Sequence, residues 1–224
     1  RDAQESRGLG DVYKRQVECL NGKKASTSIV GAVSPPGGDL SEPVVQNTMR
    51  VVRVFWSLDA KLADRRHFPS INWLTSYSLY TNLLEPWVKT NVGEDMISLR
   101  KEAMGILQRE SELMEIVQLV GADAIPENER MILETARMLR EDFLQQDAYH
   151  DVDSFCPPNK QRTMLSLIME FHHKALSALD RGVGVSDIMS SAVVEKISKM
   201  KYLTEDEFEK TRLEISEAMK EELS

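Results

Sequence analysis

The chain has 224 residues, of which 42% are hydrophobic, and 36 acidic against 28 basic residues give it a formal net charge of −8. This length can bury a core in one or two domains, while the mixing of basic with acidic residues argues against a nucleic-acid-binding surface. No apolar run approaches the roughly 20 residues of a membrane-spanning helix, so we expect a cytoplasmic protein whose contact with a membrane is indirect.

The first sixteen residues, RDAQESRGLGDVYKRQ, show no apolar period and do not begin with methionine. We interpret residues 1–16 as a non-native segment joined to an incomplete coding region and leave them out of the fold. A disordered native arm is the alternative. Both interpretations predict a loosely attached segment, because few apolar groups are present to offset the entropy of ordering it.

A strand followed by a stiffened loop is predicted next. Residues 29–33 (IVGAV) are a short run rich in β-branched side chains, and PPGG at 35–38 combines two fixed bends with a permissive backbone. Ligands in open α/β sheets bind at such strand ends. Ser34 and Asp39 flank the loop, where turn formation by the aspartate is favoured over a contact with a ligand or a neighbouring protein chain.

A second strand is predicted over residues 51–56 (VVRVFW). Asp59 can then cap a short helix that runs to Arg66, and the pair Phe68-Pro69 ends it, because a residue before proline is pushed out of the helical region. Two strands do not make a stable sheet alone. Residues 17–80 are therefore predicted to be the tail end of an α/β domain.

Beyond residue 80 the pattern is almost wholly helical, with apolar residues at the 3.6-residue period over 96–120. Residues 81–224 are therefore predicted to form a helical bundle. Its expected start and stop signals are Gly121, Pro126, Pro157 with Pro158, Gly182, Ser186 as a cap, and a Thr204–Glu207 capping box.

A phosphate-binding P-loop is missing from the sequence. That loop requires G-x-x-x-x-G-K-[ST], but Gly22-Lys23 has Val17 in place of the first glycine and Lys24 in place of the hydroxyl residue. We therefore assign no catalytic residue and expect the chain alone to be inactive in phosphate chemistry.

Two groups of residues suggest metal ligands at first sight. His150, Asp151 and Asp153 lie close together, and His172 is next to His173. Neighbouring residues on a helix point about 100° apart, and the first group lacks a cysteine or a second spaced histidine. Surface or capping roles are favoured, and no metal site is predicted.

Simple roles are also expected for the remaining reactive residues. Arg65, Arg66 and His67 form a small basic group that fits a helix end stabilised by the macrodipole, although a contact with phosphate is an alternative. Cys19 and Cys156 lie far apart, which predicts unpaired thiols in a reducing compartment, with Cys156 as a structural thiol.

Three motifs carry a specific resemblance: SPPGGDLSEPV at 34–44, RHFPSINWLTSYSLY at 66–80, and MLREDFLQQDAYHDVDSFCPP at 138–158. In these the chain resembles the catalytic A subunit (alpha chain) of A-type and V-type rotary ATP synthases and ATPases, as a carboxyl-terminal fragment, from about Val17 to about Met200. The resemblance implies a mainly α fold: the tail end of a RecA-like α/β nucleotide-binding domain, followed by an all-α helical-bundle domain.

The resemblance also implies a function. In the family, three A subunits alternate with three B subunits in an A3B3 ring around a central stalk, peripheral to the membrane. They couple ATP synthesis or hydrolysis to proton or sodium transport. ATP or ADP with Mg²⁺ is the implied ligand, and the P-loop and Mg²⁺ ligands of the family lie before this stretch.

An adenine site is implied by the same resemblance. In the family an aromatic residue before a proline stacks on the base, and Phe68 has this position. Gln146, Ala148 and Tyr149 are offered by the helical domain, with Tyr149 as the opposing wall. Spacing alone favours plain core aromatics for Phe68, Tyr149 and Phe155; the resemblance reverses this for Phe68, less firmly for Tyr149, and hardly for Phe155.

Two alternatives stay open. The chain could be a helical protein-interaction module without its own nucleotide site, which would need an exposed apolar helix face. It could also belong to the noncatalytic B subunit, which the motifs disfavour.

Overall fold

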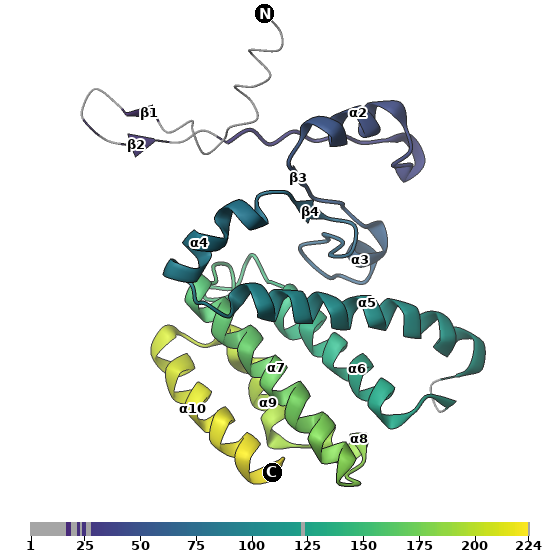
Figure 1. The fold of residues 1–224 in the computed structure, drawn as a ribbon, viewed down its shortest axis with the longest axis vertical. Helices are drawn as coiled ribbons and strands as arrows, with labels where there is room; N and C mark the ends of the chain where they lie inside the picture. The colour runs from purple at the N-terminus through teal and green to yellow at the C-terminus, as the bar shows by residue number, and fades with distance from the viewer. Residues whose placement is uncertain (1–16, 19–21, 23, 26–27, 122–123, 224) are drawn as a thin grey trace, which may run out of the picture. The chain divides into compact units, whose positions relative to one another are not determined.

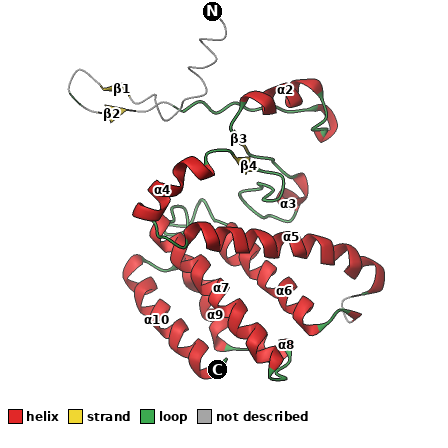
Figure 2. Ribbon diagram, viewed as in Figure 1, coloured by secondary structure: helices red, strands yellow, loops and turns green. Residues whose placement is uncertain are grey.

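The computed structural model describes residues 17–18, 22, 24–25, 28–121 and 124–223, so the segment 1–16 lies outside the described residues. The chain divides into two compact units. Among the described residues, unit 1 comprises those up to Phe55 together with Tyr77–Tyr80, and unit 2 comprises Trp56–Ser76 and those from Thr81 onward. Helices dominate the described chain, as Figure 2 shows in red.

The described residues of unit 1 form two antiparallel pairs of very short strands. β1 (Val17–Glu18) pairs with β2 (Lys24–Ala25), and β3 (Val54–Phe55) pairs with β4 (Tyr77–Ser78). The strand predicted at 29–33 is wrong for this structure. No described strand pairs with residues 29–33, and Ile29 and Val30 are exposed, so this backbone lacks the hydrogen bonds that define a strand.

The helix α2 (Pro43–Val51) was not predicted, and it ends at the first residue of the second predicted strand, of which only Val54–Phe55 form β3. The carboxylate of Glu42 accepts hydrogen bonds from the amides of Val44 and Val45, both at 3.1 Å, and Pro43 occupies the first turn. Glu42 and Pro43 are local start signals that sequence reasoning missed. The short 3-10 turn η2 (Pro36–Gly38) precedes the helix.

Unit 2 begins with a loop that folds around α3 (Ala60–Asp64). Asp59 caps this helix as predicted: its Oδ1 accepts from the amide of Lys61 at 2.9 Å, and its Oδ2 accepts from Asn72 Nδ2 at 3.0 Å. The Asn72 hydrogen bond is the main cause of a lowered pKa of the Asp59 carboxyl group. The Phe68-Pro69 peptide bond that follows is cis.

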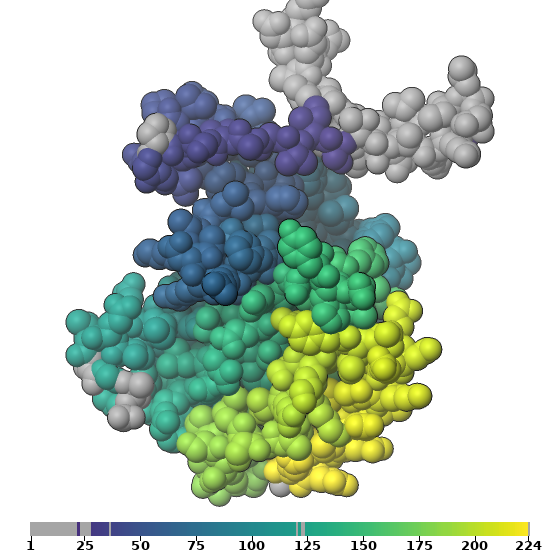
Figure 3. All heavy atoms as spheres, turned by 180° about the vertical axis from the view of Figure 1, so that it is seen from behind, coloured from purple at the N-terminus to yellow at the C-terminus, as the bar shows by residue number. Residues whose placement is uncertain are grey.

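The helical part of unit 2 contains these described elements in chain order: α4 (Thr81–Asn91), α5 (Met96–Val120), α6 (Glu127–Met138), the π-helix η4 (Leu139–Leu144), α7 (Pro158–Asp180), α8 (Val185–Met189), α9 (Ala192–Lys199), the 3-10 turn η5 (Met200–Tyr202) and α10 (Glu205–Glu222). Helices α7, α9 and α10 pack side by side (Figure 1). In the view from behind, the C-terminal residues, in yellow, lie against the green residues of the preceding helices (Figure 3), and α10 contacts both α7 and α9. No described helix is long and apolar enough to cross a membrane.

Most of the predicted helix boundaries are confirmed. Gly121 and Pro126 flank the ends of α5 and α6, and the Thr204–Glu207 capping box is formed. The predicted cap Ser186 is wrong, because α8 starts at the preceding residue. The serine that caps a helix here is Ser191, whose side chain accepts from the amide of Val193 at the start of α9.

Helix α7 runs through the centre of the hydrophobic core. Its side chains Leu165, Ile168 and Phe171 are among the largest fully buried groups in the described chain. Helices α5, α6, α9 and α10 cover it with their own apolar faces. A helix that packs against four neighbours is stabilised mainly by these contacts, so its position is fixed by its neighbours.

The adjacent histidines of α7 diverge. His172 is buried, and its Nδ1 lies 2.7 Å from the hydroxyl of Thr135, while burial lowers the pKa of its imidazole. His173 is exposed and pairs with Glu102. The two rings therefore contact different groups on different helices, and the surface or capping role favoured from the sequence is wrong for His172, which is a buried residue of the core.

Truncation in the core tests the central place of α7. We expect Phe171→Ala to lower the free energy of unfolding by about 3 to 5 kcal/mol, because it removes a fully buried ring and leaves a cavity. Leu119→Ala, at an exposed position, is the control and is expected to change stability by less than about 0.5 kcal/mol. Urea unfolding of the two variants is the measurement, and equal losses would contradict this account of the core.

Candidate functional site

The loop of residues 145–157 connects the π-helix η4 to helix α7 and contains Gln146, Ala148 and Tyr149. Phe68, the other residue singled out in the sequence, lies after α3. The amide of Gln146 donates a hydrogen bond to the carbonyl oxygen of Phe68 over 2.8 Å. This bond brings together, within unit 2, two segments that are far apart in the sequence.

The aromatic side chains at this place are exposed. The exposed fractions are 51% for Phe68, 98% for Tyr149 and 74% for Phe155. The core assignment that spacing alone favours is therefore wrong for all three residues. Exposed aromatic rings are costly in water and are typical of surfaces that bind a flat or apolar group. No ring contact joins Phe68 to Tyr149 among the described aromatic pairs, so the structure brings their two segments together without pairing the rings.

Internal hydrogen bonds give the loop its shape. The Asp153 carboxylate accepts from the amide of Asp147 at 2.7 Å, and the carbonyl oxygen of Asp153 accepts from Gln146 Nε2 at 2.6 Å. His150 Nδ1 accepts from the amides of Val152 and Asp153 at 3.1 and 3.2 Å. His150 and Asp153 thus close a turn, which agrees with the capping role favoured from the sequence. No group of three or more potential ligands for a metal ion occurs in the described part of the chain.

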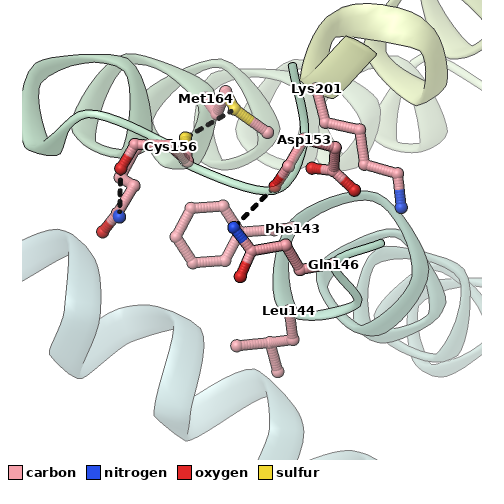
Figure 4. Close-up of a pocket in the computed structure, with 8 residues that line it drawn as sticks. Phe143, Leu144, Gln146, Asp153, Cys156, Met164 and Lys201 are labelled. Carbon is pink, nitrogen blue, oxygen red and sulfur yellow. Dashed lines mark hydrogen bonds between the residues drawn. The ribbon is translucent and has the colours of Figure 1, made fainter. Parts of the chain in front are cut away.

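A pocket of about 190 Å³ lies beneath this loop (Figure 4). Its wall includes the thiol of Cys156, 4.0 Å from the sulfur of Met164, and burial raises the pKa of this thiol. A raised pKa disfavours the nucleophilic thiolate, in agreement with a structural thiol. The lining residues are Phe143, Leu144, Gln146, Asp153, Cys156, Gln161, Met164 and Lys201.

Lys201 enters this region from the turn η5. Its ammonium group donates to the carbonyl oxygens of Glu141 at 2.7 Å and Gln145 at 3.1 Å, at the end of the π-helix. Nearby, burial raises the pKa of Asp142 to about 6, against the opposing effect of the Lys201 charge. Sequence reasoning missed Lys201, because the motif SKMKY has the composition of an exposed basic segment.

The basic group at 65–67 does not act as one unit. His67 is buried, its ring centroid lies 5.5 Å from that of Trp73, and burial lowers the pKa of its imidazole. Arg65 and Arg66 are exposed, and Arg66 has a positive φ of 58°. A buried neutral imidazole cannot attract phosphate by charge, so a three-residue phosphate site is disfavoured.

In unit 1, Asp39 has the turn-forming role favoured from the sequence. Its Oδ1 accepts from the amide of Ser41 at 2.9 Å and from the hydroxyl of Ser41 at 2.7 Å, and these bonds lower the pKa of its carboxyl group. Ser34 is exposed.

Two family models match successive parts of the chain. Residues 7–78 match the nucleotide-binding domain of the ATP synthase alpha/beta family, and residues 85–189 match the C-terminal domain of V and A type ATP synthase. The chain is 57% identical over 220 residues to the A subunit of the A-type ATP synthase of Methanococcus vannielii, covering 96% of this chain and 38% of that protein. The corresponding protein of Methanopyrus kandleri is 55% identical over 218 residues, covering 96% of this chain and 37% of that protein.

The chain belongs to the A-subunit family of A-type and V-type ATP synthases. It spans little more than a third of the length of these curated relatives. The A-subunit matches agree with the motif-based preference over the B subunit. The first family match starts at residue 7 and so includes part of the segment 1–16, whose non-native origin stays a prediction.

A solved structure shares the fold of this A-subunit chain. The structure is described as a unique ATP synthase subunit NeqB from Nanoarcheaum equitans, with a TM-score of 0.57 and 19% sequence identity, covering 76% of this chain and 40% of that one. The predicted fold class, a nucleotide-binding-domain tail followed by a helical domain, is confirmed.

The raised pKa of Asp142 predicts a pH-dependent stability. The folded chain holds the Asp142 proton more tightly than an unfolded chain does, so this stabilisation is present below about pH 4 and is lost as the pH rises through about 6. We expect Asp142→Asn to raise the free energy of unfolding at pH 8 by about 1 to 2 kcal/mol, after discounting for partial exposure, and to have no effect below about pH 4.

Thermal unfolding from pH 4 to 8 measures this difference. Asp151→Asn, at an exposed position in the same loop region, is the control and should shift stability by less than about 0.5 kcal/mol at every pH. A stabilisation by Asp142→Asn that is the same at pH 4 and pH 8 would refute the assignment to this carboxyl group.

Proposed function

We propose that this chain supplies the adenine side of the nucleotide site in the catalytic A subunit of an ion-translocating rotary ATP synthase or ATPase. The observation that carries the proposal is the hydrogen bond from the Gln146 amide to the Phe68 carbonyl oxygen, which holds the two candidate segments together. The family matches to a nucleotide-binding domain and then to a C-terminal helical domain support it.

In this proposal Phe68 and Tyr149 provide the two aromatic walls for the base. Both rings are exposed and can gain apolar contact on binding, and every nucleobase offers a flat face for stacking. Ala148 adds a small side chain next to Tyr149, and the main chain of Gln146 joins the two segments. An adenine recognised mainly by stacking tolerates small shifts in position.

The phosphate half of the reaction belongs to other parts of the complete protein. The chain has no P-loop sequence, so we propose that it contacts ATP or ADP through the base while phosphate and Mg²⁺ are held elsewhere. Positioning and electrostatic stabilisation at the phosphates supply most of the catalysis in phosphoryl transfer. In this proposal the chain therefore affects nucleotide binding more than the chemical step at the phosphate.

We also propose that the chain shares the subunit assembly of its family and the coupling of ATP chemistry to ion transport. Three A subunits and three B subunits take turns in an A3B3 ring, peripheral to the membrane, and the helical domain transmits nucleotide-dependent movement to the central stalk. Ion transport, of protons or sodium, occurs in the membrane part of the complex. Such a conformational step is distinct from chemistry at the phosphate.

A helical interaction module is the second candidate, and helix α4 favours it. Leu83, Leu84 and Trp87 on this helix are all about half exposed. Exposed apolar residues on one short helix are typical of a surface that docks on a partner. The two functions differ in what they require of Phe68.

Substitution of Phe68 tests the base site. The test uses a chimera in which this chain replaces the aligned part of the Methanococcus vannielii protein, assembled with the partners of that protein. We expect Phe68→Ala to weaken ATP affinity by about 1 to 3 kcal/mol, roughly 5- to 150-fold, and Phe68→Trp to preserve it. Stacking holds substrate and transition state nearly equally, so the Michaelis constant should rise while kcat changes little.

Phe155→Ala is the matched control for this substitution, because Phe155 is an exposed aromatic residue of the same region. It is expected to leave ATP affinity unchanged. If Phe68→Ala also leaves the affinity unchanged in a folded complex, the base site is refuted and the interaction module becomes the better explanation.

The isolated chain should not hydrolyse ATP. Because the contacts that lower the barrier at the phosphate are missing from its sequence, we expect turnover equal to the buffer background, measured as phosphate release. The assembled chimera serves as the positive control. Turnover by the isolated chain that a substitution within it abolishes would overturn this expectation.

A further inference from the structure

Two buried lysines lie on the protein side of the loop 145–157, one bonded to the loop and the other to the turn η5. Lys160, in the first turn of α7, and Lys201, in the turn η5, are each only 7% exposed. A buried ammonium group is costly unless polar partners replace its water. Both groups find such partners in main-chain carbonyl oxygens, so their placement requires a defined path of the backbone around them.

The turn η5 contacts the loop region at two points. The Lys201 ammonium donates to the carbonyl oxygens of Glu141 and Gln145, and Gln145 immediately precedes the residue that is bonded to Phe68. The ring of the next residue, Tyr202, packs against the ring of His150 with centroids 4.9 Å apart. His150 in turn accepts the amide hydrogen bonds that close the loop.

Lys160 fixes the turn itself. Its ammonium donates to the carbonyl oxygen of Lys201 at 3.0 Å and to that of Leu203 at 2.7 Å, and it lies 5.4 Å from the ring centroid of Phe208 on α10. Burial lowers the pKa of the Lys160 ammonium, as expected for a group held by dipoles rather than by a close carboxylate. The chain of contacts therefore runs from α7 to η5 and from η5 to the loop.

We propose that Lys201, held in place by Lys160, is a positioning residue that fixes the loop carrying Gln146, Ala148 and Tyr149 for contact with the nucleotide base. The inference rests on the proposed base site. Lys201 contacts no base itself; it acts through the main chain at Gln145. Since η5 joins α9 to α10, a displacement of these C-terminal helices would move the loop as well.

The test compares Lys201→Met with Lys199→Met. Both substitutions keep the apolar stem and remove one ammonium group near the end of α9, but Lys199 is exposed and pairs with Glu195 on its own helix. In the full chain, we expect Lys201→Met to speed hydrogen exchange at the amides of Gln146 and Asp147 about tenfold or more, with the core amides of α7 changed by less than about twofold. Lys199→Met should leave both sets unchanged.

A second measurement addresses the nucleotide. In the assembled chimera, Lys201→Met is expected to raise the Michaelis constant for ATP about threefold or more while kcat changes by less than about twofold. Tyr202→Ala, which removes the ring contact at a partly exposed position, keeps the test open if Lys201→Met fails to fold. It should speed exchange at the same loop amides to a smaller extent.

Three results for Lys201→Met would overturn the proposal. The first is unchanged hydrogen exchange in the loop, and the second is an equal rise of exchange in the loop and in α7. The third is faster loop exchange with an unchanged Michaelis constant for ATP, while Phe68→Ala does weaken ATP affinity in the same chimera. If neither Phe68→Ala nor Lys201→Met alters ATP affinity, the base site itself is refuted, and the role of Lys201 toward a nucleotide is refuted with it. The Phe68→Ala result thus separates the two failures.

Discussion

The irregular loop between η4 and α7 depends on hydrogen bonds that it cannot make within regular secondary structure. Buried main-chain groups must be paired, and a loop without a helix or sheet has to find its partners in side chains and neighbouring segments. Here the partners are the Asp153 carboxylate, the Nδ1 atom of His150, the carbonyl oxygen of Phe68 and the ammonium of Lys201. The shape of the candidate site follows from this requirement.

The helices around the loop supply the rigidity that it lacks. Helix α7 packs against α5, α6, α9 and α10, and Lys160 in its first turn is buried, so this turn is a fixed point from which Lys160 can hold η5. A rigid scaffold that presents residues on a loop is a common arrangement for binding sites. In this chain the aromatic side chains are presented outward, while the polar groups that hold the loop point into the protein and are largely buried.

The sequence predicted those features that depend on local chemistry. The caps at Asp59 and Thr204 and the stop at Gly121 need only nearby residues, and the structure confirms them. The strand predicted at 29–33 failed because a strand requires a partner, which a local pattern of β-branched residues does not supply.

The candidate site was predicted in part. Its motifs identified the two segments, but their spacing gave no sign that the aromatic rings would be exposed. The π-helix and the burial of Lys201 were not predictable either, because both arise from packing between elements distant in the sequence. A lysine near the end of a helix has the same local signature whether it lies in water or in the core.

The last turn of a helix leaves main-chain carbonyl groups without partners in the helix. At the end of the π-helix the Lys201 ammonium donates to two such groups, those of Glu141 and Gln145. Because the Lys201 ammonium is nearly inaccessible to water, dissolved ions cannot readily compete for these carbonyl groups. Exposed pairs such as Lys199 with Glu195 are screened as salt concentration rises, whereas buried contacts are screened much less. The contacts of Lys201 with the end of the π-helix are therefore expected to depend less on ionic strength than the exposed ion pairs of the same chain.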